Sequence, residues 1–267
     1  MKKPLNNNDE INIANLYSNK NANIRKIMGI YQIGEARVYE ILNKFNVDIR
    51  RKYYASRKYN VNERYFEVID SADKAYWLGW LFADGCNSLS LFHLTIQKND
   101  IEILNKFKTN IDSEHPILVR DNKACLLISS KQMCNDLHSL GCVNAKSLIL
   151  DWPKNLPDRL VKFFIRGYFE GDGCLSIFSR KSGQHIGQTN FYLGIMSSRI
   201  FIPKLQNKIH EKTGLLFATR NIKNNAIIYN HSQSKISAFC DWMYNEEPNL
   251  YLTRKFNKYL EIKNFTK

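Results

Sequence analysis

No stretch of this sequence is apolar for the roughly 18 residues that a membrane-spanning helix needs. Its start, MKKPLNNNDE, also lacks the apolar segment of a signal peptide. We therefore expect a soluble, intracellular protein, in the cytoplasm or an organelle matrix. Acidic residues are scarce: 25 Asp and Glu stand against 39 Lys and Arg, for a net charge of +14. A chain this basic, without an amphipathic basic helix or a lipidation motif, predicts nucleic acid as its partner and no membrane.

Paired metal-binding cysteines are missing as well. The six cysteines form no C-x-x-C pair and have no histidines at zinc-finger spacing. We therefore expect reduced, mostly packed thiols and no zinc site. Disorder is not indicated, because 44% hydrophobic residues in a chain of 267 suffice for one or two domains with a proper core.

The most informative feature that is present occurs twice. One copy reads AYWLGWLFADGC and the other, in the second half of the chain, reads FFIRGYFEGDGC. In each copy two small residues lie four positions apart, Gly79 with Ala83 and Gly167 with Gly171, so on a helix they share one face. A face of small residues lets another backbone come close, and we predict that the two helices pack against each other there.

Packing along these faces would bring Asp84 and Asp172 together at the C-terminal ends of the helices. We expect Gly85 and Gly173, which follow them, to adopt the left-handed conformation that ends a helix. Each carboxylate would face the negative end of its own helix dipole and the like charge of the other. A divalent cation would offset both effects, so the pair predicts a magnesium site.

The segments WLGWLFADG and IRGYFEGDG resemble the paired signature of the LAGLIDADG homing endonucleases, in the single-chain form that carries both copies. The resemblance covers roughly residues 70–260. It implies an α+β fold with two pseudo-symmetric αββαββα halves, residues 71–155 and residues 156–267. Their antiparallel sheets would together form a DNA-binding saddle, since a β-ribbon fits the major groove.

Alternating residues after each copy agree with such sheets. In LSLFHLTIQ, which ends at Gln97, apolar residues alternate with polar ones. In FYLGIMS the same parity places Met196 on the polar face, where we align it with Gln97. The remaining apolar periods predict helices over residues 100–108, 131–140, 202–212 and 235–244.

The resemblance implies a site-specific double-strand DNA endonuclease that acts as a monomer on a long, asymmetric site. It also implies that Mg²⁺, two or three ions in number, supports hydrolysis of the phosphodiester bonds. Both signature aspartates would bind the metals, Lys146 and Lys255 would act beside the scissile phosphates, and Gln97 would lie near the metals. Glu170 is excluded from the site, because an ion pair with Arg166 one helical turn away explains it.

A non-cleaving nucleic-acid binder on the same fold, either a transcription regulator or an intron maturase, is the alternative. Retention of Asp84 and Asp172 favours cleavage, whereas the unequal Gln97 and Met196 leave nicking or binding alone open. Either catalytic lysine could instead be a surface or phosphate-anchoring residue. The ends of the sequence do not match an intein, so we expect an intron-encoded or free-standing protein.

Ahead of the repeats, residues 1–50 resemble a helix-turn-helix module, with helical periods from Ile11 onward and a candidate recognition helix over residues 35–45. Residues 51–70 form a basic linker suited to phosphates. A plain helical hairpin and a solvated connector are the simpler alternatives. The predicted DNA-binding residues are Arg37, Lys44, Arg50, Arg51, Lys52, Arg57, Lys58, His93, Thr95, Lys98, Arg120, Lys123, Arg180, Lys181, Tyr192, Arg220 and Lys223.

Overall fold

The structure, a computed structural model, describes residues 5–18, 22–47, 59–180, 186–245 and 249–265. The chain divides into two compact units, which are described separately: one comprises residues 1–62 and 108–115, the other residues 63–107 and 116–267. In the part of the chain that the structure describes, no helix is long and apolar enough to cross a membrane.

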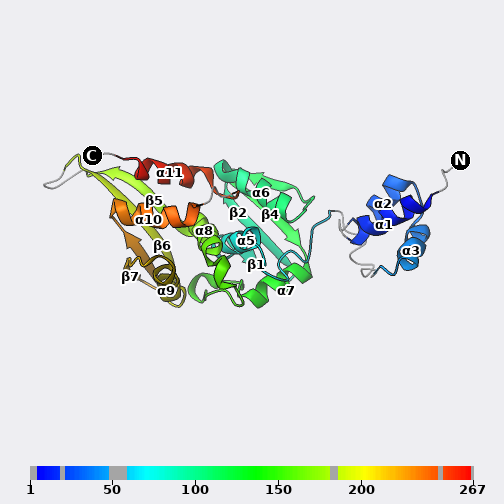
Figure 1. Cartoon of the computed structure of the whole chain (residues 1–267), viewed down its shortest axis with the longest axis horizontal. Helices are drawn as coiled ribbons and strands as arrows, with labels where there is room; N and C mark the ends of the chain where they lie inside the picture. The colour runs from blue at the N-terminus through cyan, green and yellow to red at the C-terminus, as the bar shows by residue number, and fades with distance from the viewer. Residues whose placement is uncertain (1–4, 19–21, 48–58, 181–185, 246–248, 266–267) are drawn as a thin grey trace. The chain divides into compact units, whose positions relative to one another are not determined.

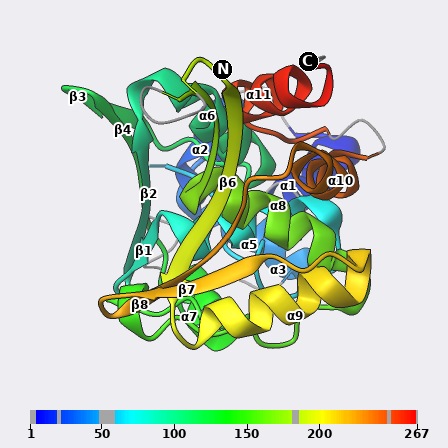
Figure 2. The same cartoon turned by 90° about the vertical axis from the view of Figure 1, so that its left-hand side faces the viewer.

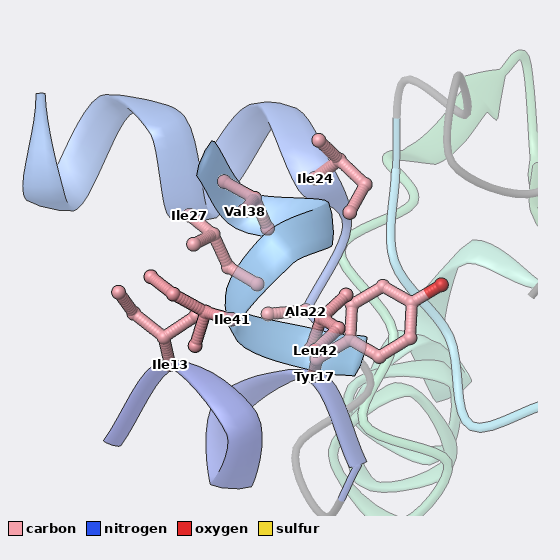
Figure 3. Packing of buried hydrophobic residues seen from close by; sticks show 8 residues of the cluster. All are labelled: Ile13, Tyr17, Ala22, Ile24, Ile27, Val38, Ile41 and Leu42. Carbon is pink, nitrogen blue, oxygen red and sulfur yellow. The ribbon is translucent and has the colours of Figure 1, made fainter. Parts of the chain in front are cut away.

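Three short helices form the core of the first unit: α1 (Asn7–Ser18), α2 (Ile24–Tyr31) and α3 (Glu35–Lys44). Their buried apolar side chains meet in one cluster with Ala22 of the α1–α2 connection; the helical members are Ile13, Tyr17, Ile24, Ile27, Val38, Ile41 and Leu42 (Figure 3). Helix α1 begins earlier than expected because Asn6 and Asp9 cap each other. The Asn6 side chain accepts from the Asp9 N–H at 2.8 Å, and the Asp9 carboxylate accepts from the Asn6 N–H at 3.0 Å.

Two similar halves form the second unit, each in the order helix, two strands, helix, two strands, helix. The first half contains α5 (Ala72–Ala83), β1 (Gly85–Asn87), β2 (Leu91–Gln97), α6 (Ile101–Asn110), β3 (Ile117–Arg120), β4 (Lys123–Ser129) and α7 (Lys131–Leu140). The second half contains α8 (Val161–Asp172), β5 (Gly173–Ser179), β6 (Thr189–Ser198), α9 (Phe201–Thr213), β7 (Ala218–Ile222), β8 (Asn225–Asn230) and α10 (Gln233–Tyr244). The α+β architecture with two αββαββα halves is confirmed. A further helix, α11 (Thr253–Lys263), was not expected.

Each half has one four-stranded antiparallel sheet, and the strand orders match: β1-β2-β4-β3 and β5-β6-β8-β7. In β2 the buried Phe92, Leu94 and Ile96 alternate with side chains that reach solvent, as the sequence pattern predicts. Figure 2 shows the first sheet nearly edge-on at the left, with α5 and α6 on one side of it. One face of the sheet is therefore core, and the other is open.

Helices α5 and α8 lie side by side at the centre of the second unit (Figure 1). A Cβ atom added at Gly79 would collide with the backbone of Phe164 and Tyr168, and one added at Gly167 would collide with the backbone of Tyr76. Backbone of each helix thus occupies the space where the other helix lacks a side chain. This confirms that the two repeated helices pack along their small residues.

The prediction that the two glycines after the aspartates adopt the left-handed conformation is wrong. Gly173 has φ −74° and ψ 148°, and Gly85 is not among the residues with positive φ. Each of these glycines instead starts a strand directly after its helix. A Cβ at Gly85 would collide with Leu81, and a Cβ at Gly173 would collide with Phe169. Glycine is needed here because the strand turns back closely over the helix end, not because of its backbone dihedrals.

We expect Gly79→Leu or Gly167→Leu to lower the free energy of unfolding by at least about 1 to 3 kcal/mol, because a large side chain would push the helices apart. Urea or thermal unfolding measures the loss. Gly29→Leu is the control, since Gly29 is exposed and an added Cβ there meets nothing within 4 Å. If both buried-site variants melted like the control, the helices would not meet at these residues.

Candidate active site

Asp84 and Asp172 stand at the C-terminal ends of the two central helices. Asp84 caps α5, with its N–H bonded to the carbonyl of Trp80 at 2.9 Å, and Asp172 is the last residue of α8. A Cβ added at Gly171 would lie 3.2 Å from Oδ2 of Asp84. The Asp84 carboxylate therefore reaches the last turn of α8, beside Asp172, and the structure brings the two predicted metal ligands together.

Both carboxylates hold their protons more tightly than an ordinary aspartate, although each residue keeps contact with solvent. Partial burial, followed by the charge of Asp172, raises the pKa of Asp84 to about 6, against the opposing effect of Lys255 and Lys146. Burial likewise raises the pKa of Asp172, while Tyr168 and the same two lysines oppose the shift. A cation bound between the two carboxyl groups would offset the free-energy cost of ionising both of them.

Lys255 is almost fully buried under the end of α8. Its ammonium donates to the carbonyl oxygens of Phe169 at 2.7 Å, of Glu170 at 2.8 Å, and of Gly173. Burial, and next the charge of Arg254, lower the pKa of Lys255 to about 8. These bonds cover carbonyls at the end of the helix, where the Phe169 carbonyl also accepts from the N–H of Gly173, and they use all three donors of the ammonium.

Lys146, in the first half, also bonds to a backbone carbonyl, but it is less buried than Lys255. It begins the 3₁₀ helix η2 (Lys146–Leu148), is half-buried, and donates to the carbonyl oxygen of Gly85. Each predicted lysine thus bonds to the glycine that follows its aspartate. Within the described residues the Lys146 ammonium makes this one bond, so two of its donors can turn toward a substrate phosphate.

Gln97 ends β2, is exposed, and pairs in register with Lys123 of β4. The registers correct its predicted alignment with Met196. Gly85 pairs with Leu94 and Gly173 pairs with Ile195, so Met196 corresponds to Thr95 and the residue that corresponds to Gln97 is Ser198. Parity fixes the face on which a residue lies but not its register, so the predicted alignment was displaced by two residues along the strand.

Glu170 is fully buried and stays outside the site, as predicted, but the expected ion pair with Arg166 is wrong. Its carboxylate accepts from the hydroxyls of Tyr76 at 2.5 Å and Tyr244 at 2.9 Å, and from the N–H of Leu252 at 2.9 Å. Arg166 instead donates to the carbonyl of Met243 and influences Glu170 only through its nearby charge. Glu170 ties α5, α8 and α10 together behind the aspartates.

The predicted DNA-binding residues of the two sheets lie on open faces or at strand ends. His93 and Thr95 are on the outer face of β2, and Tyr192 has the matching parity on β6. Most of the cations lie at the ends of strands and in turns: Lys98 in η1 (Lys98–Asp100), Arg120 and Lys123 beside the β3–β4 turn, Arg180 after β5 and Lys223 in the β7–β8 turn. Arg220 is in the middle of β7. Their role in binding DNA remains a prediction.

In the first unit, the cations of the candidate recognition helix are paired within the unit. The carboxylate of Glu10, largely buried, accepts from Arg37 at 2.7 Å and from Lys44 at 2.5 Å. Arg37 also bonds to Glu40 at 2.8 Å. Both cations are therefore engaged within the unit, and their role in binding DNA stays a prediction. The predicted contacts Arg50, Arg51, Lys52, Arg57, Lys58 and Lys181 lie outside the described residues.

Sequence reasoning missed two residues near the aspartates. Tyr168 lies one helical turn before Asp172 and opposes the rise of its pKa; the spacing of four on one helix was a usable signal. Arg254 lies near Asp84 while its guanidinium binds the buried Asp100 at 2.8 and 3.0 Å. No local pattern reveals Arg254, since Asp100 is in the other half of the unit.

Two carboxylates form the donor set that Mg²⁺ ordinarily takes from a protein, because this ion keeps several waters and completes its shell with substrate phosphate. Across the described residues, no group of three or more His, Cys, Asp and Glu side chains could hold a metal by itself. Asp84 and Asp172 therefore fit an ion shared with a phosphate rather than an ion held by the protein alone.

Comparison of the sequence with models of protein families, and with curated proteins, gives no match. Solved structures do match. The I-SmaMI LAGLIDADG homing endonuclease bound to cleaved DNA aligns at 13% identity with a TM-score of 0.51, covering 73% of this chain and 88% of that one. LAGLIDADG meganuclease I-AabMI bound to uncleaved DNA aligns at 11% identity and 0.51, covering 73% and 91%. Meganuclease I-SmaMI bound to uncleavable DNA aligns at 14% and 0.50, covering 70% and 86%. This chain therefore has the fold of the single-chain LAGLIDADG homing endonucleases.

The raised pKa of Asp84 predicts a pH-dependent effect of Asp84→Asn. Between about pH 4 and pH 6 the unfolded chain has released a proton that the folded protein keeps, so folding stability falls as the pH rises through this window. Without metal, the variant should melt above the parent at pH 7 and together with it below about pH 4. Asp121→Asn, in the exposed β3–β4 turn, controls for the loss of one negative charge. A shift of equal size at every pH would contradict the prediction.

Proposed function

We propose that this chain, which has the LAGLIDADG homing-endonuclease fold, is a site-specific double-strand DNA endonuclease dependent on a divalent metal ion. The observation that carries the proposal is the convergence of Asp84 and Asp172 at the ends of two packed helices, between two sheets whose outer faces are open. The net charge of +14 supports a polyanionic substrate. A solved structure of the same fold, that of the I-SmaMI LAGLIDADG homing endonuclease, is bound to cleaved DNA.

In this proposal the two aspartates would hold the metal ions that act on the scissile phosphates. A bound Mg²⁺ would supply an activated water and stabilise the charge that develops on phosphate and leaving oxygen. Lys146 would donate to a phosphate oxygen, and Gln97 would orient the attacking water through its amide. Lys255 would not contact the phosphate. Its bonds to carbonyls stabilise the end of α8 and thereby the position of Asp172.

Both halves of the site lie on one chain, so the protein would act as a monomer. The two sheets present different side chains, and a DNA site read by unlike surfaces has no reason to be symmetric. The proposed target is therefore long and asymmetric. The alternative, a binder that does not cut, gains support from one observation: in the second half, the exposed residue beside the aspartate is Met196, which can neither donate to phosphate nor polarise water.

Cleavage is tested by incubating the protein with Mg²⁺ and DNA of the uninterrupted insertion locus of its own gene, with the interrupted locus as the negative substrate. We expect a double-strand break in the uninterrupted locus only. Asp84→Asn and Asp172→Asn should each abolish that break, because a metal ligand is lost, and should leave binding intact or tighter, because a negative charge near phosphate is gone. Double-strand cutting by either variant would remove these residues from the site, and binding without cutting by the parent would favour the alternative.

The basic linker is tested by the salt dependence of binding, in the Asp84→Asn background so that the DNA stays whole. Changing the linker residues Arg51, Lys52, Arg57 and Lys58, together with the adjoining Arg50, to Gln should weaken binding. It should also lower the slope of log affinity against log salt by roughly 0.9 for each phosphate that the linker no longer neutralises. The control replaces Lys204, Lys208 and Lys212 of α9, which pair with acidic residues. A linker variant with the parental slope would mean that these cations do not bind phosphate.

A further inference from the structure

A cavity lies between α10 and α11, which run side by side in the second unit (Figure 1). Its volume of about 480 Å³ is within the range of about 300 to 1,000 Å³ that small-molecule sites occupy. The residues that line it are Asp241, Trp242, Tyr244, Asn245, Tyr259 and Lys263. None of them belongs to the candidate active site or to an open sheet face, so the proposed endonuclease chemistry does not account for this cavity.

Aromatic rings form the walls of the cavity. The rings of Tyr244 and Tyr259 stack, with centroids 5.4 Å apart and planes at 22°, and both side chains are buried. The Tyr244 hydroxyl donates to Glu170 at 2.9 Å, which fixes this wall to the core. Trp242 is half-buried and therefore keeps part of its indole surface accessible. A planar ring can stack on an accessible indole, and this stacking contributes to affinity without requiring charge.

The polar groups of the cavity bond partly to one another. Oδ1 of Asp241 accepts from the hydroxyl of Tyr259 at 2.5 Å and from the ammonium of Lys263 at 2.6 Å. Lys263 also donates to the Tyr259 oxygen at 3.2 Å. Within the described residues this leaves Oδ2 of Asp241 as an acceptor and one donor of Lys263, and the exposed Asn245 adds an amide that can both donate and accept. Unused donors and acceptors thus lie beside the aromatic walls.

The charges of the cavity balance, because the carboxylate of Asp241 is paired with Lys263. A simple ion of either sign therefore gains little net attraction there. A nucleobase matches the cavity better, since it has two flat faces and an edge that carries both donors and acceptors. In a duplex both faces are stacked and the edge is paired, so only an unpaired base can enter. The net charge of +14 attracts the phosphate that accompanies such a base.

We propose that the cavity between α10 and α11 binds an unpaired nucleobase, with its ring against Trp242 and its edge toward Asp241, Asn245 and Lys263. The base belongs to a single-stranded nucleic acid or to a free nucleotide, which present the same ring and the same edge. This site goes beyond the proposed endonuclease function and does not rest on it, because it takes an unpaired base rather than duplex DNA and needs no metal ion.

The test uses the full-length protein in EDTA, so that no strand is cut, and a short single strand of mixed sequence beside the same strand with its bases removed. Stacking on Trp242 should quench tryptophan fluorescence with the intact strand and not with the abasic one. The intact strand should also stay bound at a salt concentration that releases the abasic strand, because stacking depends on salt less than phosphate contacts do. Release of both strands at the same salt concentration would overturn the inference.

Variants of Trp242 assign the binding to the cavity, and anisotropy of the labelled strand measures it. Trp242→Leu should weaken binding of the intact strand at least about fivefold, because one base–aromatic stack is lost. Trp242→Phe keeps a ring, so it should keep most of the affinity while the fluorescence response disappears. Neither variant should change the affinity for the abasic strand or for duplex DNA. The matched control is Tyr251→Leu, since Tyr251 is half-buried and does not line the cavity. Equal losses in Trp242→Leu and Tyr251→Leu would contradict the assignment.

Asn245→Ala tests the edge of the base without disturbing the packing, because Asn245 is exposed at the end of α10. It should weaken binding of the intact strand about two- to tenfold, the loss expected for one hydrogen bond, at a parental melting temperature. Parental affinity in both Asn245→Ala and Trp242→Leu would overturn the inference.

The four mononucleotides identify the source of the base. A mononucleotide that binds as tightly as the strand assigns the cavity to a free nucleotide, whereas tighter binding of the strand assigns it to single-stranded nucleic acid. Both results support a site for an unpaired base. If neither the strand nor any mononucleotide changed the fluorescence of Trp242, the cavity would not be such a site.

Discussion

The contact between α5 and α8 is the constraint on which the rest of the second unit depends. Because backbone of each helix fills the space above Gly79 and Gly167, the two helices approach more closely than ordinary side chains would allow. That approach aligns their C-terminal ends and sets Asp84 next to the last turn of α8. A wider contact would keep both sheets but separate the aspartates, so the site depends more on two missing side chains than on any hydrogen bond.

Two helix C-termini and two carboxylates lie close together and concentrate negative charge. Two lysines from other parts of the sequence lie near this charge and partly offset it. Lys146 and Lys255 each bond to the carbonyl of the glycine after an aspartate. They thereby satisfy helix ends and oppose the repulsion without neutralising the carboxylates. Burial, and next the like charge of Asp172, still raise the pKa of Asp84, which leaves the site prepared for a cation.

The halves repeat the same order of elements, yet the same position serves different purposes in each. Gln97 is exposed, whereas Ser198 is committed to the first turn of α9. Lys146 keeps donors available, whereas Lys255 uses its donors on carbonyls. Fusing both halves in one chain allows such divergence, because each half needs to support the shared helix contact but not to duplicate the chemistry of its twin.

The sequence by itself determined the repeated helices, their stripe of small residues, the parity of the strands and the two aspartates, because these are patterns of neighbouring residues with fixed periods. Only the tertiary structure decided what depends on residues far apart. It showed that Gly85 and Gly173 serve close packing rather than a left-handed turn, and that Glu170 bonds to tyrosines of α5 and α10. It also showed that Met196 matches Thr95, because strand register follows from hydrogen bonds between strands, and the parity of one strand fixes only the face on which a residue lies.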